Sequence, residues 1–152
     1  MILISHRGNT NGKNIEKENS PDYIINTLNL GYDVEIDIWY INNEWFFGHD
    51  EPTYKIDLET FKKYVNNIWF HCKNLQALEK IRNFENSCYF WHENDKYTLT
   101  SNNLIWTYPN MELSELSICV LPELHKYSYT ELISCYGICS DFIKNYKNIN
   151  YL

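Results

Sequence analysis

The first fifty residues contain the side chains with the clearest potential for chemistry. Two histidines, His6 and His49, each directly follow a predicted strand, and they lie beside Arg7 and Asp50 respectively. Histidine changes charge near neutral pH, so a pair of histidines suits general acid and general base catalysis. The planar guanidinium of Arg7 suits the binding of anionic oxygens. These residue types therefore indicate acid–base chemistry on an anionic substrate.

A second group of side chains has the spacing of a metal site. Glu35 and Asp37 lie two residues apart in a predicted strand, so both carboxylates face one side, while Val34, Ile36 and Ile38 face the other. Two neighbouring carboxylates repel each other unless a cation lies between them, and Mg²⁺ and Ca²⁺ prefer such oxygen ligands. The alternative is an exposed strand face with scattered charge.

The elements that position these residues alternate between strands and helices. Strands are predicted at residues 2–5, 32–40, 68–72, 88–92, 104–107, 118–121 and 137–140, and helices at 21–30, 58–65, 75–84 and 129–135. Residues 44–47 are expected to return from a hairpin turn at Asn42-Asn43. This alternation favours a parallel sheet covered by helices, and polar groups follow most strands, as at the active-site edge of an α/β barrel. A full barrel needs at least roughly 200 residues. We therefore predict a shortened or incomplete TIM-type (βα) barrel of about seven strands in a single domain of residues 1–152, with an open, flat α/β sheet as the alternative.

Composition and charge argue against several classes of protein. The net charge of −7 argues against general nucleic-acid binding, which needs a basic surface. No apolar run reaches membrane-spanning length, so no integral membrane segment is expected. The five cysteines lack metal-type spacing, and no signal peptide is expected before His6. Together these features predict reduced, buried thiols in a cytoplasmic protein.

The ordered motifs resemble those of one known family. His6-Arg7-Gly8, Glu18-Asn19, Glu35-x-Asp37 and His49-Asp50 together resemble the glycerophosphodiester phosphodiesterase family, within the phospholipase C-like phosphodiesterases, over about residues 3–75. The resemblance implies that His6 and His49 act as acid and base across the scissile phosphorus. It also implies that Arg7 binds a phosphoryl oxygen, that Glu35 and Asp37 bind the metal, and that Glu18, Asn19 and Asp50 support the site.

The strand predicted at residues 68–72 departs from the family pattern. The family places an acidic metal ligand two residues before a lysine, and here His71 stands at that position before Lys73. If His71 is a ligand, Mn²⁺, Fe²⁺ or Zn²⁺ joins Mg²⁺ and Ca²⁺ as a candidate, because imidazole suits transition metals. The alternatives are that His71 contacts the substrate or lies in the core. Lys73 adds positive charge for a phosphate, Trp106 is expected at the substrate pocket or in the core, and His92 and Glu93 are further pocket candidates.

With the resemblance, these residues predict a metal-dependent phosphodiester hydrolase acting on a glycerophosphodiester-like substrate by catalysis with two histidines. One alternative is a lyase of the sphingomyelinase-D toxin type, which ends at a cyclic phosphate. Another is a non-catalytic binder of phosphorylated head groups or glycans. The expected partner is a small phosphodiester, and the open edge of a truncated barrel also predicts a homo-oligomer.

Overall fold

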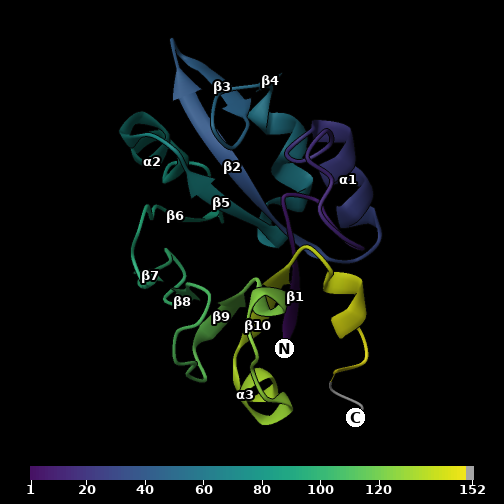
Figure 1. The fold of residues 1–152 in the computed structure, drawn as a ribbon. Helices are drawn as coiled ribbons and strands as arrows, with labels where there is room; N and C mark the ends of the chain where they lie inside the picture. The colour runs from purple at the N-terminus through teal and green to yellow at the C-terminus, as the bar shows by residue number, and fades with distance from the viewer. Residues whose placement is uncertain (150–152) are drawn as a thin grey trace.

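Ten strands form one mixed sheet that curls into a half-barrel in the computed structural model, which describes residues 1–149 (Figure 1). The last three residues of the predicted domain, 150–152, lie outside the described residues. The strands are β1 (Ile2–His6), β2 (Asp33–Ile41), β3 (Glu44–Phe47), β4 (Tyr54–Ile56), β5 (Ile68–Cys72), β6 (Cys88–Phe90), β7 (Tyr97–Leu99), β8 (Ile105–Thr107), β9 (Ser117–Val120) and β10 (Gly137–Ser140).

Parallel strands make up the middle of the sheet. β1 pairs with β2 on one side and with β10 on the other, so the first and last strands of the chain lie side by side (Figure 1). From there the parallel pairing continues through β5 to β6 and through β9 to β8. β3 and β4 add an antiparallel extension to β2, and β7 pairs antiparallel with β8.

Helices are short and cover only part of the sheet. The α-helices are α1 (Pro21–Asn29), α2 (Leu75–Ile81) and α3 (Tyr129–Ser134), and the 3₁₀ helices are η1 (Leu58–Asn67), η2 (Pro122–Leu124) and η3 (Ile143–Tyr146). The predicted helix at 58–65 thus forms as a 3₁₀ helix. Within residues 1–149, none of the helices combines the length and the apolar character that crossing a membrane requires.

The predicted TIM-type (βα) barrel of about seven strands is therefore wrong, and the flat-sheet alternative does not describe the curled sheet either. The connections explain the difference. The segment 108–116 joins the parallel strands β8 and β9 without a helix, and the segment 91–96 joins β6 to β7 in the same way. A crossover that includes a helix takes roughly 10–12 residues or more. The segment 108–116 is too short for one. Between β6 and β8 the chain forms the strand β7 rather than a helix, and β4 adds a further strand beside β3.

The alternation of residues along the strands explains why polar groups gather at one edge. Val34, Ile36 and Ile38 point outward from β2 into a core shared with α1, η1 and α2. The inner face holds a second core that includes Ile4, Trp69, Phe90, Trp106 and Val120. Successive residues on one face are two apart in sequence. The residues two positions after Ile4, Trp69 and Phe90 therefore lie on the same face. They are His6, His71 and His92, at the carboxyl ends of their strands.

All five cysteines are free thiols, as predicted, and all except the half-buried Cys88 are buried. Burial raises the pKa of Cys72 and of Cys88 to about 12. Because the thiolate is the reactive form, we expect a thiol reagent at pH 8 to modify native thiols slowly and all five after unfolding. Unfolded thiols ionise near pH 8.5, so the free energy of unfolding should fall as the pH rises from about 9 towards 12. Rapid labelling of all thiols in the native protein would contradict this expectation.

Candidate active site

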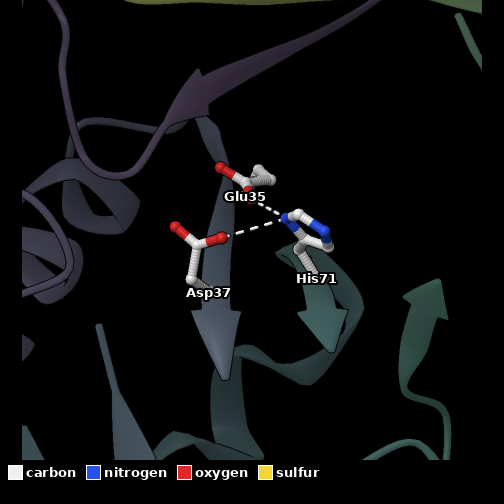
Figure 2. A group of neighbouring side chains, drawn as sticks. All are labelled: Glu35, Asp37 and His71. Carbon is white, nitrogen blue, oxygen red and sulfur yellow. Dashed lines mark ion pairs between the residues drawn. The ribbon is translucent and has the colours of Figure 1, made fainter. Parts of the chain in front are cut away.

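Two adjacent parallel strands bring three ligand-type side chains together. Asp37 of β2 lies in register with His71 of β5, and Glu35 precedes Asp37 on the same inner face. Figure 2 shows both carboxylates directed toward the His71 ring, whose Nδ1 lies 2.9 Å from Asp37 Oδ1 and 3.6 Å from Glu35 Oε1. One ligand atom from each of these buried side chains lies within 4.8 Å of the others. The structure thus groups the three residues predicted to bind the metal.

Two oxygens of this cluster have no hydrogen-bond partner among residues 1–149. Glu35 Oε2 and Asp37 Oδ1 are buried and accept no hydrogen bond from residues 1–149. The short contact between His71 Nδ1 and Asp37 Oδ1 lacks hydrogen-bond alignment and is an ion pair. Leaving a buried carboxylate oxygen unpaired is costly, and a cation would satisfy both oxygens. Two carboxylates and an imidazole therefore fit a divalent metal ion.

The ring of His71 is held in place by its surroundings. Its Nε2 lies 3.2 Å from the carbonyl oxygen of His92, which can only accept, so Nε2 carries a hydrogen and donates it. The ring packs parallel to the rings of Phe90 and His92, with centroids 5.1 and 4.7 Å away. Burial alone would lower the pKa of His71, but the carboxylates of Asp37 and Glu35 outweigh it and raise this pKa to about 9. Without a metal, protonated His71 partly neutralises the two carboxylates.

Asp37 contacts several charged and polar side chains at once. Its Oδ2 lies 2.9 Å from Arg7 Nε, accepts a hydrogen bond of 2.9 Å from Asn19 Nδ2, and lies 3.2 Å from His49 Nδ1. Asn19 Oδ1 accepts the backbone N–H of Asp37 in return, and Lys73 Nζ lies 3.5 Å from Asp37 Oδ1. Burial alone would raise the pKa of Asp37, but the neighbouring rings of His49 and His71 and the charge of Arg7 hold that pKa well below its usual range. Asp37 is therefore an ionised carboxylate at neutral pH.

The two histidines predicted to act as acid and base are oriented in the same way. His6 Nδ1 lies 2.8 Å from Asp141 Oδ1, and His49 Nδ1 lies 3.2 Å from Asp37 Oδ2. A carboxylate at Nδ1 holds a proton there and leaves Nε2 for chemistry. The Nε2 atom of His6 lies 3.9 Å from Glu35 Oε2, and that of His49 lies 3.2 Å from Arg7 Nη2. Both histidines thus direct Nε2 toward the charged cluster, where Nε2 of His49 accepts a hydrogen bond from Arg7.

The loop after β1 positions Arg7 through an unusual backbone. Arg7 and Asn19 adopt positive φ angles of 54° and 61°. The N–H of Arg7 donates to the carbonyl of Glu35, and the N–H of Asn19 donates to the carbonyl of Arg7. Glu18 Oε2 lies 3.3 Å from Arg7 Nη1. Non-glycine residues held in this region cost free energy and cluster at functional sites, so the predicted supporting roles of Glu18 and Asn19 have a geometric basis.

Asn9 and Asp141 join the site although no role is predicted for them from the sequence. Asn9 Nδ2 donates to Glu18 Oε1 at 2.9 Å and to Asp141 Oδ1 at 2.8 Å, which ties the loop after β1 to the end of β10. Asp141 Oδ1 is also the partner of His6. Asp141 directly follows the last predicted strand, and this position in the sequence indicates that it lies at the same edge of the sheet. Asn9 lies in a polar loop, where nothing in the sequence distinguishes it.

A cavity of about 700 Å³ opens over this edge of the sheet. Its lining has a polar part made of His6, Arg7, Glu35, His49, His71 and Lys73, and an apolar part made of Trp91, Trp106, Tyr108, Leu121 and Leu124. His92 and Glu93 line it as well, and burial lowers the pKa of His92 to about 4, so this ring is neutral. Trp106 is also part of the inner core, where its ring lies 4.4 Å from that of Phe90. Asp50 is exposed, 3.6 Å from His49 Nε2.

The turn before His49 depends on a glycine. Gly48 has a φ of 149°, and a Cβ atom there would lie 2.1 Å from the carbonyl oxygen of Glu51. We expect Gly48→Ala to lower the free energy of unfolding by about 3 kcal/mol, because both the backbone and the overlap must be relieved. Gly31→Ala is the matched control, since Gly31 also has a positive φ but an open surrounding. It should cost about 1 kcal/mol, and equal losses in denaturant unfolding would contradict the role of the overlap.

None of the family models, curated proteins or solved structures compared with the chain matches it. The geometry itself defines a curled half-barrel with a buried cluster of two carboxylates and one imidazole at its carboxyl edge. Two further histidines, each held by a carboxylate, flank this cluster.

Proposed function

We propose that this protein is a metal-dependent phosphodiesterase of the glycerophosphodiester phosphodiesterase type. The observation that carries the proposal is the placement of His6 and His49. Each has Nδ1 on a carboxylate, and their Nε2 atoms lie beside Glu35 and Arg7 at the candidate metal centre. A protein that only binds phosphate has no need of two oriented acid–base groups next to a cation site. The resemblance of residues 3–75 to the family supports the same conclusion.

In this proposal, cationic groups hold the phosphodiester. Arg7 and Lys73 line the cavity, and both lie against Asp37, within 2.9 and 3.5 Å. Their N–H groups donate to the non-bridging oxygens of the substrate and stabilise the charge that grows there in the transition state. Glu35, Asp37 and His71 would hold a divalent ion, which would add positive charge at the same phosphoryl group.

The two histidines move the protons. The Nε2 atom of one accepts a proton from the nucleophile as its oxygen bonds to phosphorus, and the Nε2 atom of the other donates a proton to the departing alkoxide as the P–O bond breaks. Asp141 keeps the His6 ring oriented from 2.8 Å. Water as the nucleophile gives a phosphomonoester and an alcohol. A neighbouring hydroxyl of the substrate gives a cyclic phosphate, which is the final product in the toxin-type lyases.

The proposed substrate is a small phosphodiester of the glycerophosphodiester class. Its phosphate lies at the polar part of the cavity lining, and the apolar part around Tyr108 and Leu124 receives an uncharged organic group. The cytoplasmic location and the homo-oligomer predicted from the sequence remain parts of this proposal.

Phosphorus-31 NMR of glycerophosphodiesters incubated with the metal-loaded protein tests the proposed reaction. We expect conversion of the phosphodiester signal to that of a phosphomonoester, and no conversion in the presence of a chelator. Accumulation of a cyclic phosphate would assign the lyase reaction instead. An unchanged phosphodiester that still binds the folded protein would favour the non-catalytic binder and contradict the proposal.

A further inference from the structure

We infer that the centre formed by Glu35, Asp37 and His71 takes a transition-metal ion, such as Mn²⁺, Co²⁺ or Zn²⁺, through the Nδ1 atom of His71 and in preference to Mg²⁺ or Ca²⁺. This inference deepens the proposed function and rests on it, because it names the ion that the same site uses. Four observations support it, and its test measures binding rather than turnover.

The first observation is that the protein presents Nδ1 of His71 as a ligand atom. The carbonyl of His92 accepts the hydrogen of Nε2 at 3.2 Å, so the lone pair of the neutral ring lies at Nδ1. Histidines that bind metals usually donate their other ring N–H to a carbonyl or carboxylate in this way. Stacking on Phe90 and His92 fixes the plane of the ring. Nδ1 is therefore aimed at the carboxylates before any ion arrives.

The second observation is the spacing of the ligand atoms. Neighbouring ligands of a small divalent ion with bonds of about 2.0–2.1 Å lie roughly 2.8–3.0 Å apart in octahedral geometry and roughly 3.3–3.4 Å apart in tetrahedral geometry. His71 Nδ1 lies 2.9 Å from Asp37 Oδ1, at the octahedral separation, and 3.6 Å from Glu35 Oε1, slightly beyond the tetrahedral one. Calcium prefers 6–8 oxygen ligands at about 2.3–2.6 Å. Because an imidazole stands in place of a carboxylate, this centre offers fewer of the oxygen ligands that calcium needs.

The third observation is that two buried carboxylate oxygens lack a hydrogen bond within the described part of the chain. This is separate evidence from the grouping of acidic residues itself. Glu35 Oε2 and Asp37 Oδ1 accept no hydrogen bond from residues 1–149, and Glu35 and Asp37 are only 2% and 0% exposed. Oxygens buried so completely are normally paired. An ion bound by His71 Nδ1 and these carboxylates would satisfy them.

The fourth observation is the charge around the carboxylates. Arg7 and Lys73 lie 2.9 and 3.5 Å from Asp37 and offset much of the negative charge of the cluster. A hard ion such as Mg²⁺ depends mainly on that charge and gives up its water reluctantly. A transition ion gains an additional bond to imidazole nitrogen, which does not depend on the net charge. The surroundings therefore weaken the binding of hard ions more than that of transition ions.

Calorimetric titration of the metal-stripped protein with Mn²⁺ and with Mg²⁺ tests this inference. Transition ions bind most sites more tightly than Mg²⁺, so the diagnostic quantity is how the ratio of the two dissociation constants changes in variants. We expect His71→Glu, which supplies the oxygen ligand of the family pattern, to shift this ratio toward Mg²⁺ by about tenfold or more. His125→Glu is the matched control, because His125 lies outside the residues that line the cavity. An equal ratio in the wild type and His71→Glu would overturn the inference.

The wild-type protein provides a second test that does not depend on a variant folding. Pulsed electron paramagnetic resonance of bound Mn²⁺ detects directly coordinated nitrogen, and we expect a nitrogen modulation that His71→Gln abolishes. Bound Mn²⁺ without nitrogen modulation would overturn the inference, and so would a signal that persists in His71→Gln. Because neither test uses a substrate, failure of the proposed phosphodiesterase activity would leave both results interpretable.

Discussion

His6→Ala is expected to lower kcat for phosphodiester cleavage by about 10²- to 10⁴-fold, the usual contribution of a positioned acid or base. The loss should appear in kcat rather than in metal affinity. His6 holds its Nδ1 on Asp141, and its Nε2 lies 3.9 Å from Glu35 Oε2, outside the three-residue cluster. Steady-state kinetics with saturating metal, together with calorimetric metal titration of the same variant, would measure both quantities.

His125→Ala is the matched control for this prediction. His125 contacts Tyr127, with ring centroids 6.3 Å apart, and does not line the cavity. Its removal should leave kcat within a factor of about two. If His6→Ala kept full activity while remaining folded, the acid–base role of His6 would be refuted. If it lost metal affinity and activity in parallel, His6 would be a ligand rather than an acid or base.

Asp37→Asn is expected to have a large effect on both metal binding and stability. Asp37 is completely buried and pairs with Arg7, His49, His71 and Lys73. A neutral amide leaves these positive and polar groups without their carboxylate, and removing one partner of a buried ion pair costs about 3–5 kcal/mol. It would also remove a charged ligand of the proposed metal centre. We expect loss of measurable Mn²⁺ binding and a free energy of unfolding that is lower by about 3 kcal/mol.

Denaturant unfolding with and without Mn²⁺ separates these two effects. Wild-type protein should be stabilised by the ion, because a ligand that binds only the folded state adds to its free energy of unfolding. Asp37→Asn should start from a lower value and gain nothing from Mn²⁺. Asp22→Asn, a change at an exposed position in the first turn of α1, should resemble the wild type. Retention of the Mn²⁺ effect in Asp37→Asn would contradict its place as a ligand.

The local geometry of the site follows from the sequence because it depends on short-range rules. The period of two in a strand places Glu35 and Asp37 on one face and Ile36 on the other, and the structure has this arrangement. His6 and His71 were likewise expected at one edge because each lies at the carboxyl end of a parallel strand, and both line the cavity. Asp141 follows β10 in the same way, but its contact with His6 spans 135 positions of the sequence and is fixed only by the pairing of β1 with β10.

The overall architecture was not predictable in the same way. Whether seven or ten strands form, and whether the sheet is covered by helices, depends on what each linker can hold. The three-residue strands β4 and β7 are too short to show a period in sequence. Residues 58–65 have the apolar spacing of a helix but fold as part of the 3₁₀ helix η1, whose Leu58, Phe61 and Val65 are buried. These side chains belong to the core that also contains residues of β2 and β5, and such long-range contacts are not visible in a local pattern.

The most direct test of the proposed function is the rate of bis(p-nitrophenyl) phosphate cleavage by metal-stripped protein before and after Mn²⁺ is added. The aromatic groups of this substrate suit the apolar part of the cavity lining, which includes Trp91 and Tyr108. We expect no cleavage with chelator, cleavage that saturates with Mn²⁺, and no recovery in Asp37→Asn. Failure of the folded wild-type protein to cleave either this ester or glycerophosphodiesters with Mn²⁺, Zn²⁺, Mg²⁺ or Ca²⁺ would contradict a metal-dependent phosphodiesterase.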